Sequence, residues 1–245
     1  MDIFADKYDK MVGADYDKII KFIDSNIKMY KPDSSLVCDL GCGTGTVALS
    51  LSQRGYDVIA IDSNDTMLMV AREKAFELND SKTLFLCQDI VDFELYGTVD
   101  VIFSTLDTVN YITDANDLDT FFKWVRNYLN FDGLFIFDVN SEYKFNDVLN
   151  NKTFFYDYDD MFCSWEVQKE DDEYCHYLTY FIKQSDGTYK RYDNTQVQRF
   201  YSCEIIENVA KKYDFEILCI KDDYSDNEVN QTTQRYTYVM KTNKS

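Results

Sequence analysis

The stretch that decides the fold of this 245-residue chain is Val37-Cys38-Asp39-Leu40-Gly41-Cys42-Gly43-Thr44-Gly45-Thr46. Its apolar first half predicts a buried strand, and its three glycines predict a tight turn that leads into a helix. Glycine lets a ligand approach the backbone closely, and the N-terminus of a helix offers unpaired N–H groups. The stretch therefore predicts a site for a dinucleotide or nucleoside at the carboxyl end of a strand.

Around this stretch, short apolar strands alternate with helices. The alternation predicts an α/β domain with a doubly wound, largely parallel sheet of the Rossmann-like type. A helix over residues 6–29 comes first, and a pair of strands at 215–221 and 235–241 comes last, so the final strand is expected to be antiparallel. The expected strands of the parallel part are residues 36–40, 57–62, 83–87, 99–104 and 133–138.

Near residue 143 the pattern changes. Aromatic and charged residues alternate in runs such as 162–167 and 177–182, and Asp186-Gly187 between two such runs is a hairpin signal. We therefore expect three or four antiparallel strands inserted into the α/β domain. The expected division is an α/β domain of residues 1–142 and 202–245, with an inserted β lid of residues 143–201 that covers the substrate.

Two acidic residues stand where a nucleoside site needs them. Asp62 ends the second strand, 21 residues after Gly41, where a carboxylate can bind both ribose hydroxyls. Asp89 ends the third strand, where it could meet an adenine amino group. The alternative is that both are solvated acids beside an ordinary glycine turn. A nicotinamide site fits less well, because the Gly-x-Gly-x-x-Gly spacing would need glycine where Thr46 stands.

Composition narrows the classes of partner. The chain has 25 basic and 44 acidic residues, a net charge of −19, and a field of that sign repels phosphate backbones and anionic lipid. Nucleic acid and membranes are therefore unexpected partners, and a neutral or cationic small molecule is a better expectation. Seven cysteines without a Cys-x-x-Cys pair, and one histidine, argue against a metal site and favour reduced thiols in the cytoplasm. That histidine, His176, lies in a half-exposed strand, and we expect it to face solvent.

With these residues in this order, the chain resembles the class I S-adenosylmethionine-dependent methyltransferases. The resemblance covers about residues 1–142 and 202–245. One departure is Leu134, which stands where the family usually has a second glycine. The matching motifs are residues 39–45, 60–67, 87–90 and 131–133.

The resemblance implies S-adenosyl-L-methionine as the cofactor. Gly41 and Gly43 would contact its methionine end, Asp62 would bind the ribose, and Asp89 would read the adenine edge. The full set of residues assigned to the cofactor is Tyr8, Asp39, Gly41, Gly43, Asp62, Ser63, Met67, Asp89, Ile90 and Leu106.

A narrower resemblance, over residues 4–9, 106–112 and 137–141, is to a group of small bacterial methyltransferases of unassigned substrate. The inserted sheet is similar to that of enzymes that N-methylate amino sugars on nucleotides, and of glycine N-methyltransferase-like proteins. In these relatives the N-terminal helix closes over the cofactor, which implies a place there for Tyr8. The alternative for Tyr8, and the preferred interpretation for Tyr16, is the packed face of an amphipathic helix.

The residues that follow the fourth strand are expected to face the substrate, because this strand ends beside the cofactor crevice. They are Asp107, Asn110 and Tyr111. Asp107 is the candidate catalytic residue, since it could accept a proton from an amine or orient it, and its alternative role is a turn cap. From the insert, Trp165 and Arg199 are candidate substrate contacts. Arg199 could hold a carboxylate or phosphate of the substrate. The alternative for Trp165 is packing within the sheet, and the alternative for Arg199 is a surface ion pair.

The sequence thus predicts an enzyme that transfers a methyl group from S-adenosyl-L-methionine to a nitrogen or oxygen of a small molecule by in-line displacement. Such a reaction depends on alignment more than on an acid or a base. The alternatives are an RNA or protein methyltransferase, or a module that binds S-adenosylmethionine or S-adenosylhomocysteine without catalysis. A monomer or a homodimer is expected.

Overall fold

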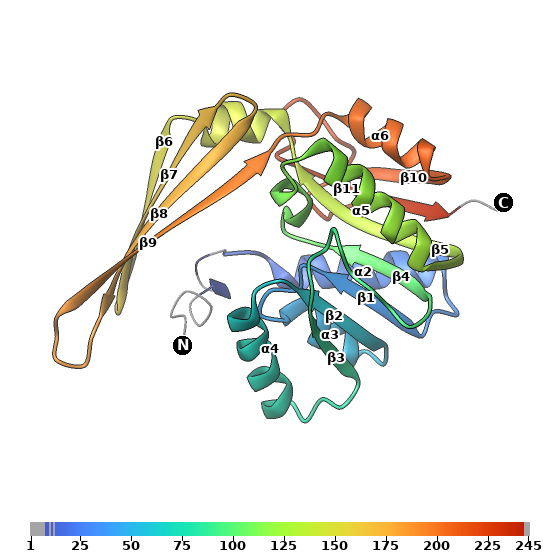
Figure 1. The fold of residues 1–245 in the computed structure, drawn as a ribbon, viewed down its shortest axis with the longest axis horizontal. Coiled ribbons are helices and arrows are strands. Elements are labelled where there is room, and N and C mark those ends of the chain that lie inside the picture. The colour runs from blue at the N-terminus through green and yellow to red at the C-terminus, as the bar shows by residue number, and fades with distance from the viewer. Residues whose placement is uncertain (1–7, 10, 12, 243–245) are drawn as a thin grey trace.

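The structure, a computed structural model, describes residues 8–9, 11 and 13–242 and contains a seven-stranded and a four-stranded sheet (Figure 1). The larger sheet has the order β10-β11-β5-β4-β1-β2-β3. Its first five strands in sequence are parallel, and β11 and β10 are antiparallel to their neighbours. Their bounds are β1 Leu36–Leu40, β2 Asp57–Asp62, β3 Thr83–Cys87, β4 Val99–Ser104, β5 Leu129–Asn140, β10 Phe215–Asp222 and β11 Arg235–Thr242.

This order creates the crevice that such sheets use for ligands. The chain runs outward from β1 to β2 and β3, and then returns to β4 on the other side of β1. Ligands of open α/β sheets bind outside the carboxyl ends of the strands at such a switch point. The strands appear where the sequence predicts them, except that β5 begins at Leu129, directly after the preceding helix.

Helices cover both faces of the larger sheet (Figure 1). Helices α2 and α3 pack their apolar residues on one face, while α5 and α6 pack a cluster rich in phenylalanine on the other. The helix bounds are α2 Tyr16–Tyr30, α3 Thr46–Gln53, α4 Asp65–Glu77, α5 Ala115–Tyr128 and α6 Cys203–Lys212. None of the described helices is both long and apolar enough to cross a bilayer.

The helix predicted over residues 6–29 is not continuous: residues 8, 9 and 11 are helical, but a break separates them from α2. Gly13 has φ +57° and residues 13–15 are not helical, so α2 begins at Tyr16. The Asp15 side chain accepts the Lys18 N–H at 3.0 Å and caps the helix there, as aspartate commonly does. Residues 6, 7, 10 and 12 of the predicted helix lie outside the described part of the chain.

The four-stranded sheet is antiparallel and stands beside the larger sheet (Figure 1). The turn predicted at Asp186-Gly187 is present, with φ +85° at Gly187, and a second tight turn at residues 171–172 joins β7 to β8. A 3-10 helix, η1 Thr108–Tyr111, follows β4, and a π-helical turn, η2 Lys144–Leu149, joins β5 to the smaller sheet. The strand bounds are β6 Lys152–Tyr158, β7 Met161–Glu170, β8 Glu173–Lys183 and β9 Tyr189–Arg199.

Candidate active site

A glycine turn follows β1 and opens into α3. Gly41, Gly43 and Gly45 have φ of +78°, +53° and +74°, which residues with side chains rarely adopt. A Cβ on Gly41 would lie 2.3 Å from Thr108 Cγ2, so packing against η1 also requires glycine there. A Cβ on Gly43 would have the Tyr8 ring as its nearest contact, at 3.8 Å. The Tyr8 ring therefore lies close over the glycine turn.

Asp62, at the carboxyl end of β2, is held by two backbone donors. One carboxylate oxygen accepts the Gly43 N–H at 2.8 Å, and the other accepts the Asn64 N–H at 2.8 Å. Burial raises the pKa of Asp62, and the two N–H groups oppose that rise. The carboxylate is thus fixed beside the glycine turn, where its remaining lone pairs can accept hydroxyl donors.

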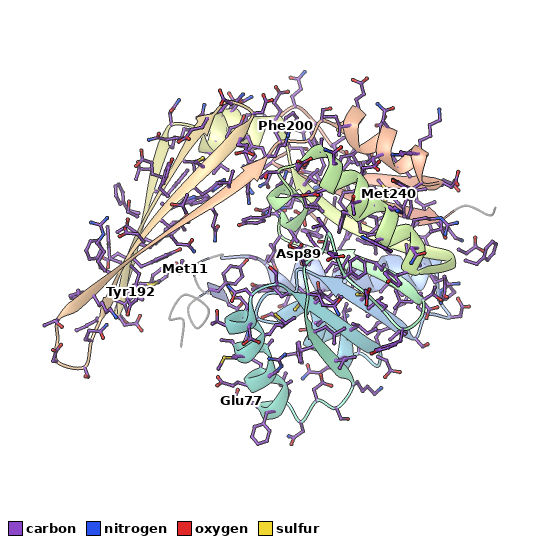
Figure 2. The ribbon with its side chains drawn as sticks, viewed as in Figure 1. Met11, Glu77, Asp89, Tyr192, Phe200 and Met240 are labelled. Carbon is purple, nitrogen blue, oxygen red and sulfur yellow. The ribbon has the colours of Figure 1, made fainter. Side chains whose placement is uncertain are left out.

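A cavity of about 470 Å³ lies along the carboxyl ends of these strands. Nine of the ten residues that the sequence assigns to the cofactor line it, and the tenth, Asp39, does not. Figure 2 shows one of the nine, Asp89, near the middle of the molecule. The nine are Tyr8, Gly41, Gly43, Asp62, Ser63, Met67, Asp89, Ile90 and Leu106.

Asp39 lies in β1 just before the glycine turn and is only 1% exposed. Within the described part of the chain, neither of its carboxylate oxygens has a hydrogen-bond partner. Burial and the nearby Asp62 carboxylate both raise the pKa of Asp39. A buried carboxyl group without a partner is costly. The end of β1 is therefore suited to a ligand that brings hydrogen-bond donors or positive charge.

The N-terminal segment is held over the glycine turn by Asp9, a residue for which the sequence predicts no role. One Asp9 oxygen accepts the Thr44 hydroxyl at 2.7 Å and the Tyr16 hydroxyl at 2.9 Å. The other accepts the Lys74 ammonium at 2.5 Å and the Thr46 hydroxyl at 3.3 Å. These bonds link the segment to α2, α3 and α4, and they hold the neighbouring Tyr8 at the cavity.

A second cavity, of about 190 Å³, adjoins the first and lies between the larger sheet and the inner face of β7, β8 and β9. Four residues, Tyr8, Leu106, Tyr111 and Gln196, line both cavities, so the two cavities meet there. Burial, then the Asp107 and Asp62 carboxylates, raise the pKa of Tyr8, so its hydroxyl stays protonated at neutral pH. Figure 2 shows Met11, from the same segment, close to the smaller sheet, where it packs against the apolar cluster of that sheet.

Asp107 lines the second cavity and belongs to a buried ionic network. Its carboxylate pairs with Arg235 Nη2 at 2.8 Å and accepts the Gln198 side-chain N–H at 2.6 Å. Arg235 also pairs with Asp138 Oδ2 at 2.5 Å. Burial alone would raise the pKa of Asp107, but Arg235, Lys144 and the Gln198 hydrogen bond together lower it. The Asp107 carboxylate therefore stays ionised, which suits electrostatic positioning better than uptake of a proton.

The other residues predicted to face the substrate are placed differently from one another. Tyr111 and Trp165 line the second cavity. Asn110 is fully buried and links η1 to two strands, since it donates to the Arg199 carbonyl at 2.8 Å and accepts the Asn140 N–H at 2.8 Å. Arg199 lines neither cavity. Its guanidinium donates to the carbonyl of residue 113 at 2.8 Å, and it pairs with an exposed aspartate of the β7–β8 turn at 3.9 Å.

Two further residues, His176 and Lys144, line the second cavity, although the sequence predicts no role in the site for either. The expectation that His176 faces solvent is wrong, because it is 5% exposed and lines this cavity. Alternate residues of β8, namely Tyr174, His176, Tyr180 and Ile182, are buried, so His176 lies on the covered face of this half-exposed strand and not on the outer one. Lys144, at the start of η2, lines the same cavity, and π-helical turns are frequent at functional sites.

Comparisons with known proteins agree with this geometry. A family model described as a methyltransferase domain matches residues 37–133. The Bacillus subtilis (strain 168) protein named "Putative methyltransferase YqeM" is 29% identical over 246 residues, which cover 99% of this chain and 97% of that protein. The crystal structure of an S-adenosylmethionine-dependent methyltransferase from Clostridium acetobutylicum ATCC 824 is 36% identical, with a TM-score of 0.90 over 98% of each chain. SAM-bound CalS10, an amino pentose methyltransferase from Micromonospora echinaspora, shares the fold, with a TM-score of 0.78 at 13% identity over 99% of this chain and 98% of that one.

The fold and the crevice are those of a class I S-adenosylmethionine-dependent methyltransferase. This chain belongs to that family, and S-adenosylmethionine is its cofactor. The site fits this group, whose sulfonium and ammonium are both positive: Asp39 is a buried carboxyl without a partner beside the turn, and Asp62 offers lone pairs for ribose hydroxyls. The resemblance stated from the sequence is confirmed at the level of family, fold and cofactor.

Proposed function

We propose that this enzyme transfers the methyl group of S-adenosylmethionine to a nitrogen or oxygen of a small molecule held in the cavity beneath the four-stranded sheet. The observation that carries the proposal is that this cavity meets the cofactor crevice, since Tyr8, Leu106, Tyr111 and Gln196 line both. Its volume of about 190 Å³ is below the roughly 300–1,000 Å³ of sites for drug-sized ligands, which favours a small acceptor.

When bound, the cofactor supplies a methyl group on a positively charged sulfur, ready for in-line displacement. The chain's own residues then have to align the acceptor and exclude water, and alignment alone can contribute about 7–11 kcal/mol to the barrier reduction. Leu106 and Asp107 have φ of +57° and +56°, an unusual pair of left-handed residues at the end of β4. The Asp107 N–H donates to Asp138 at 2.8 Å and the Leu106 N–H to the Tyr224 hydroxyl at 3.3 Å, so this bend is held firmly where the cavities join.

The net charge of −19 supports a small molecule over RNA, and the seven unpaired cysteines support a place in the cytoplasm. A protein substrate would have to present a single side chain through a narrow cavity. The remaining rival is a module that binds the cofactor and its demethylated product without turnover.

Calorimetric titration with S-adenosylmethionine, S-adenosylhomocysteine and NAD tests the first step. We expect the two adenosyl ligands to bind the wild-type protein and to lose affinity in Asp62→Ala, with NAD inactive. Asp65→Ala is the matched control, because Asp65 lies three residues further on, is exposed and does not line the cavity.

A methyl-transfer assay against panels of small amines, phenols and carboxylic acids, with peptide and RNA controls, tests the second step. Turnover of a small molecule supports the proposal. Turnover of only peptide or RNA contradicts it, as does tight cofactor binding without any turnover.

A further inference from the structure

His176 presents one unpaired N–H group to the substrate cavity. The Trp165 indole N–H, which can only donate, donates to His176 Nδ1 at 3.1 Å, so Nδ1 carries no proton. Burial, aided by nearby Lys144 and opposed by Asp107, lowers the pKa of His176 to about 4, so the ring is neutral at pH 7. Its single proton is therefore on Nε2. Within the described part of the chain, this buried nitrogen has no hydrogen-bond partner.

Lys144 offers further donors in the same cavity. Its ammonium donates to the Asn140 side-chain oxygen at 2.8 Å, which uses one of three N–H groups. Among the described residues, no carboxylate lies within ion-pair distance of Lys144. Burial, then the charge of Arg235, lowers the pKa of Lys144 to about 8 despite three carboxylates further away. The cavity wall thus holds an ammonium group without a counter-ion.

The side-chain oxygens that could accept hydrogen bonds around this cavity already have donors within the protein. The Asp107 carboxylate accepts from Arg235 and Gln198. The Gln198 side-chain oxygen accepts from Asn140 at 3.3 Å, and the Gln196 side-chain oxygen accepts from Tyr111 at 3.0 Å. Donors are therefore in excess, and buried donors are normally satisfied. A ligand that satisfies these donors must bring hydrogen-bond acceptor atoms. Beside an ammonium group, a negatively charged hydrogen-bond acceptor binds most strongly.

We infer that the methyl acceptor carries a carboxylate, which binds between the Lys144 ammonium and the His176 Nε2–H. This inference rests on the proposed function and adds the class of substrate to it. The apolar part of the molecule then packs on Trp165 and Leu178, which line the same cavity. The atom to be methylated lies at the other end, toward Tyr8 and Leu106. The long-range field of the chain favours cations, but the local donors decide what the cavity binds.

The chain has one histidine, so ¹⁵N-histidine NMR reports on His176 alone. The probes are phenylacetate, phenylacetamide and phenethylamine, which share one aromatic body, together with acetate as the smallest acid. They are titrated into protein saturated with S-adenosylhomocysteine. We expect the free protein to show the Nε2–H tautomer. We expect phenylacetate to shift the Nε2–H resonance and to bind at least tenfold more tightly than the amide.

Lys144→Met removes the charge at nearly constant volume, and we expect it to reduce phenylacetate affinity to that of the amide. Lys183→Met is the matched control, because Lys183 is an exposed lysine of the same strand as His176 and lines neither cavity. Phenylacetamide or phenethylamine binding as tightly as phenylacetate overturns the inference. So does an Nδ1–H tautomer, or an Nε2–H resonance that neither acid moves. S-adenosylhomocysteine affinity is measured in the same samples and separates the two proposals. A wild-type protein that does not bind S-adenosylhomocysteine contradicts the proposed function itself, whereas normal binding confines a negative result to the carboxylate inference.

Discussion

Acidification should destabilise this protein through His176. The pKa of its buried ring is about 4, against 6.5 for an unfolded histidine, because burial disfavours the charged form. Above pH 6.5 the ring is neutral in both states and folding carries no penalty. Between pH 6.5 and 4 the unfolded chain gains a proton that the folded chain does not, so stability falls as the pH falls. At 1.36 kcal/mol per pKa unit, the loss is about 3 kcal/mol in full and about 2 kcal/mol at pH 5.

Urea unfolding between pH 7.5 and 5 measures this effect when the wild type is compared with His176→Gln. Glutamine keeps an acceptor for the Trp165 N–H but does not titrate, so the difference between the two proteins isolates the imidazole from every carboxyl group. We expect the wild type to lose about 2 kcal/mol more than the variant over this range. Equal losses in the two proteins, or an NMR titration of the single histidine with a midpoint above pH 6, would refute the reasoning.

Three further variants probe the site. Gly41→Ala should abolish S-adenosylhomocysteine binding measured by calorimetry, because its Cβ would meet Thr108 at 2.3 Å and φ is +78°. Gly97→Ala, whose Cβ would meet nothing within 4 Å, should bind as the wild type does. Arg235→Met should lower the free energy of unfolding by about 3–5 kcal/mol, because it leaves buried carboxylates without their counter-charge, and an unchanged urea midpoint would contradict this. Asp9→Asn should weaken S-adenosylhomocysteine binding and the weakening should shrink at high salt, since the lost ion pair to the α4 lysine is electrostatic; equal affinity at low salt would count against this role.

Much of the larger sheet could be predicted because its signals are local. The glycine turn and Asp62 lie in consecutive segments, where the apolar run, the turn and the strand-end acid each have a recognisable pattern. The hairpins of the smaller sheet also follow from local turn residues. The crevice formed by these elements collects nine of the ten residues that the sequence assigns to the cofactor, since parallel strands bring their carboxyl ends to one edge.

The second cavity could not be predicted in this way, because it is assembled from distant segments without motifs. The ion-pair partner of Asp107 is Arg235, 128 residues later, and no local pattern connects the two. Lys144 gave no signal beyond an ordinary lysine after a strand. His176 was misjudged because alternation within one strand does not reveal which of its two faces is covered. Asp9 stood in a motif that the resemblance already included, but only its neighbour Tyr8 was assigned a role.

The second cavity is lined by residues from both ends of the described chain. Tyr8 and Arg235 both line it, although 227 positions (235 minus 8) separate them. Chains fold from the N-terminus as they leave the ribosome, and β1 to β4 are complete by residue 104. The second cavity is therefore among the last features to form during synthesis. A translation product that stops before β11 lacks Arg235 of that cavity, and with it the counter-charge of Asp107, however well its earlier strands have paired.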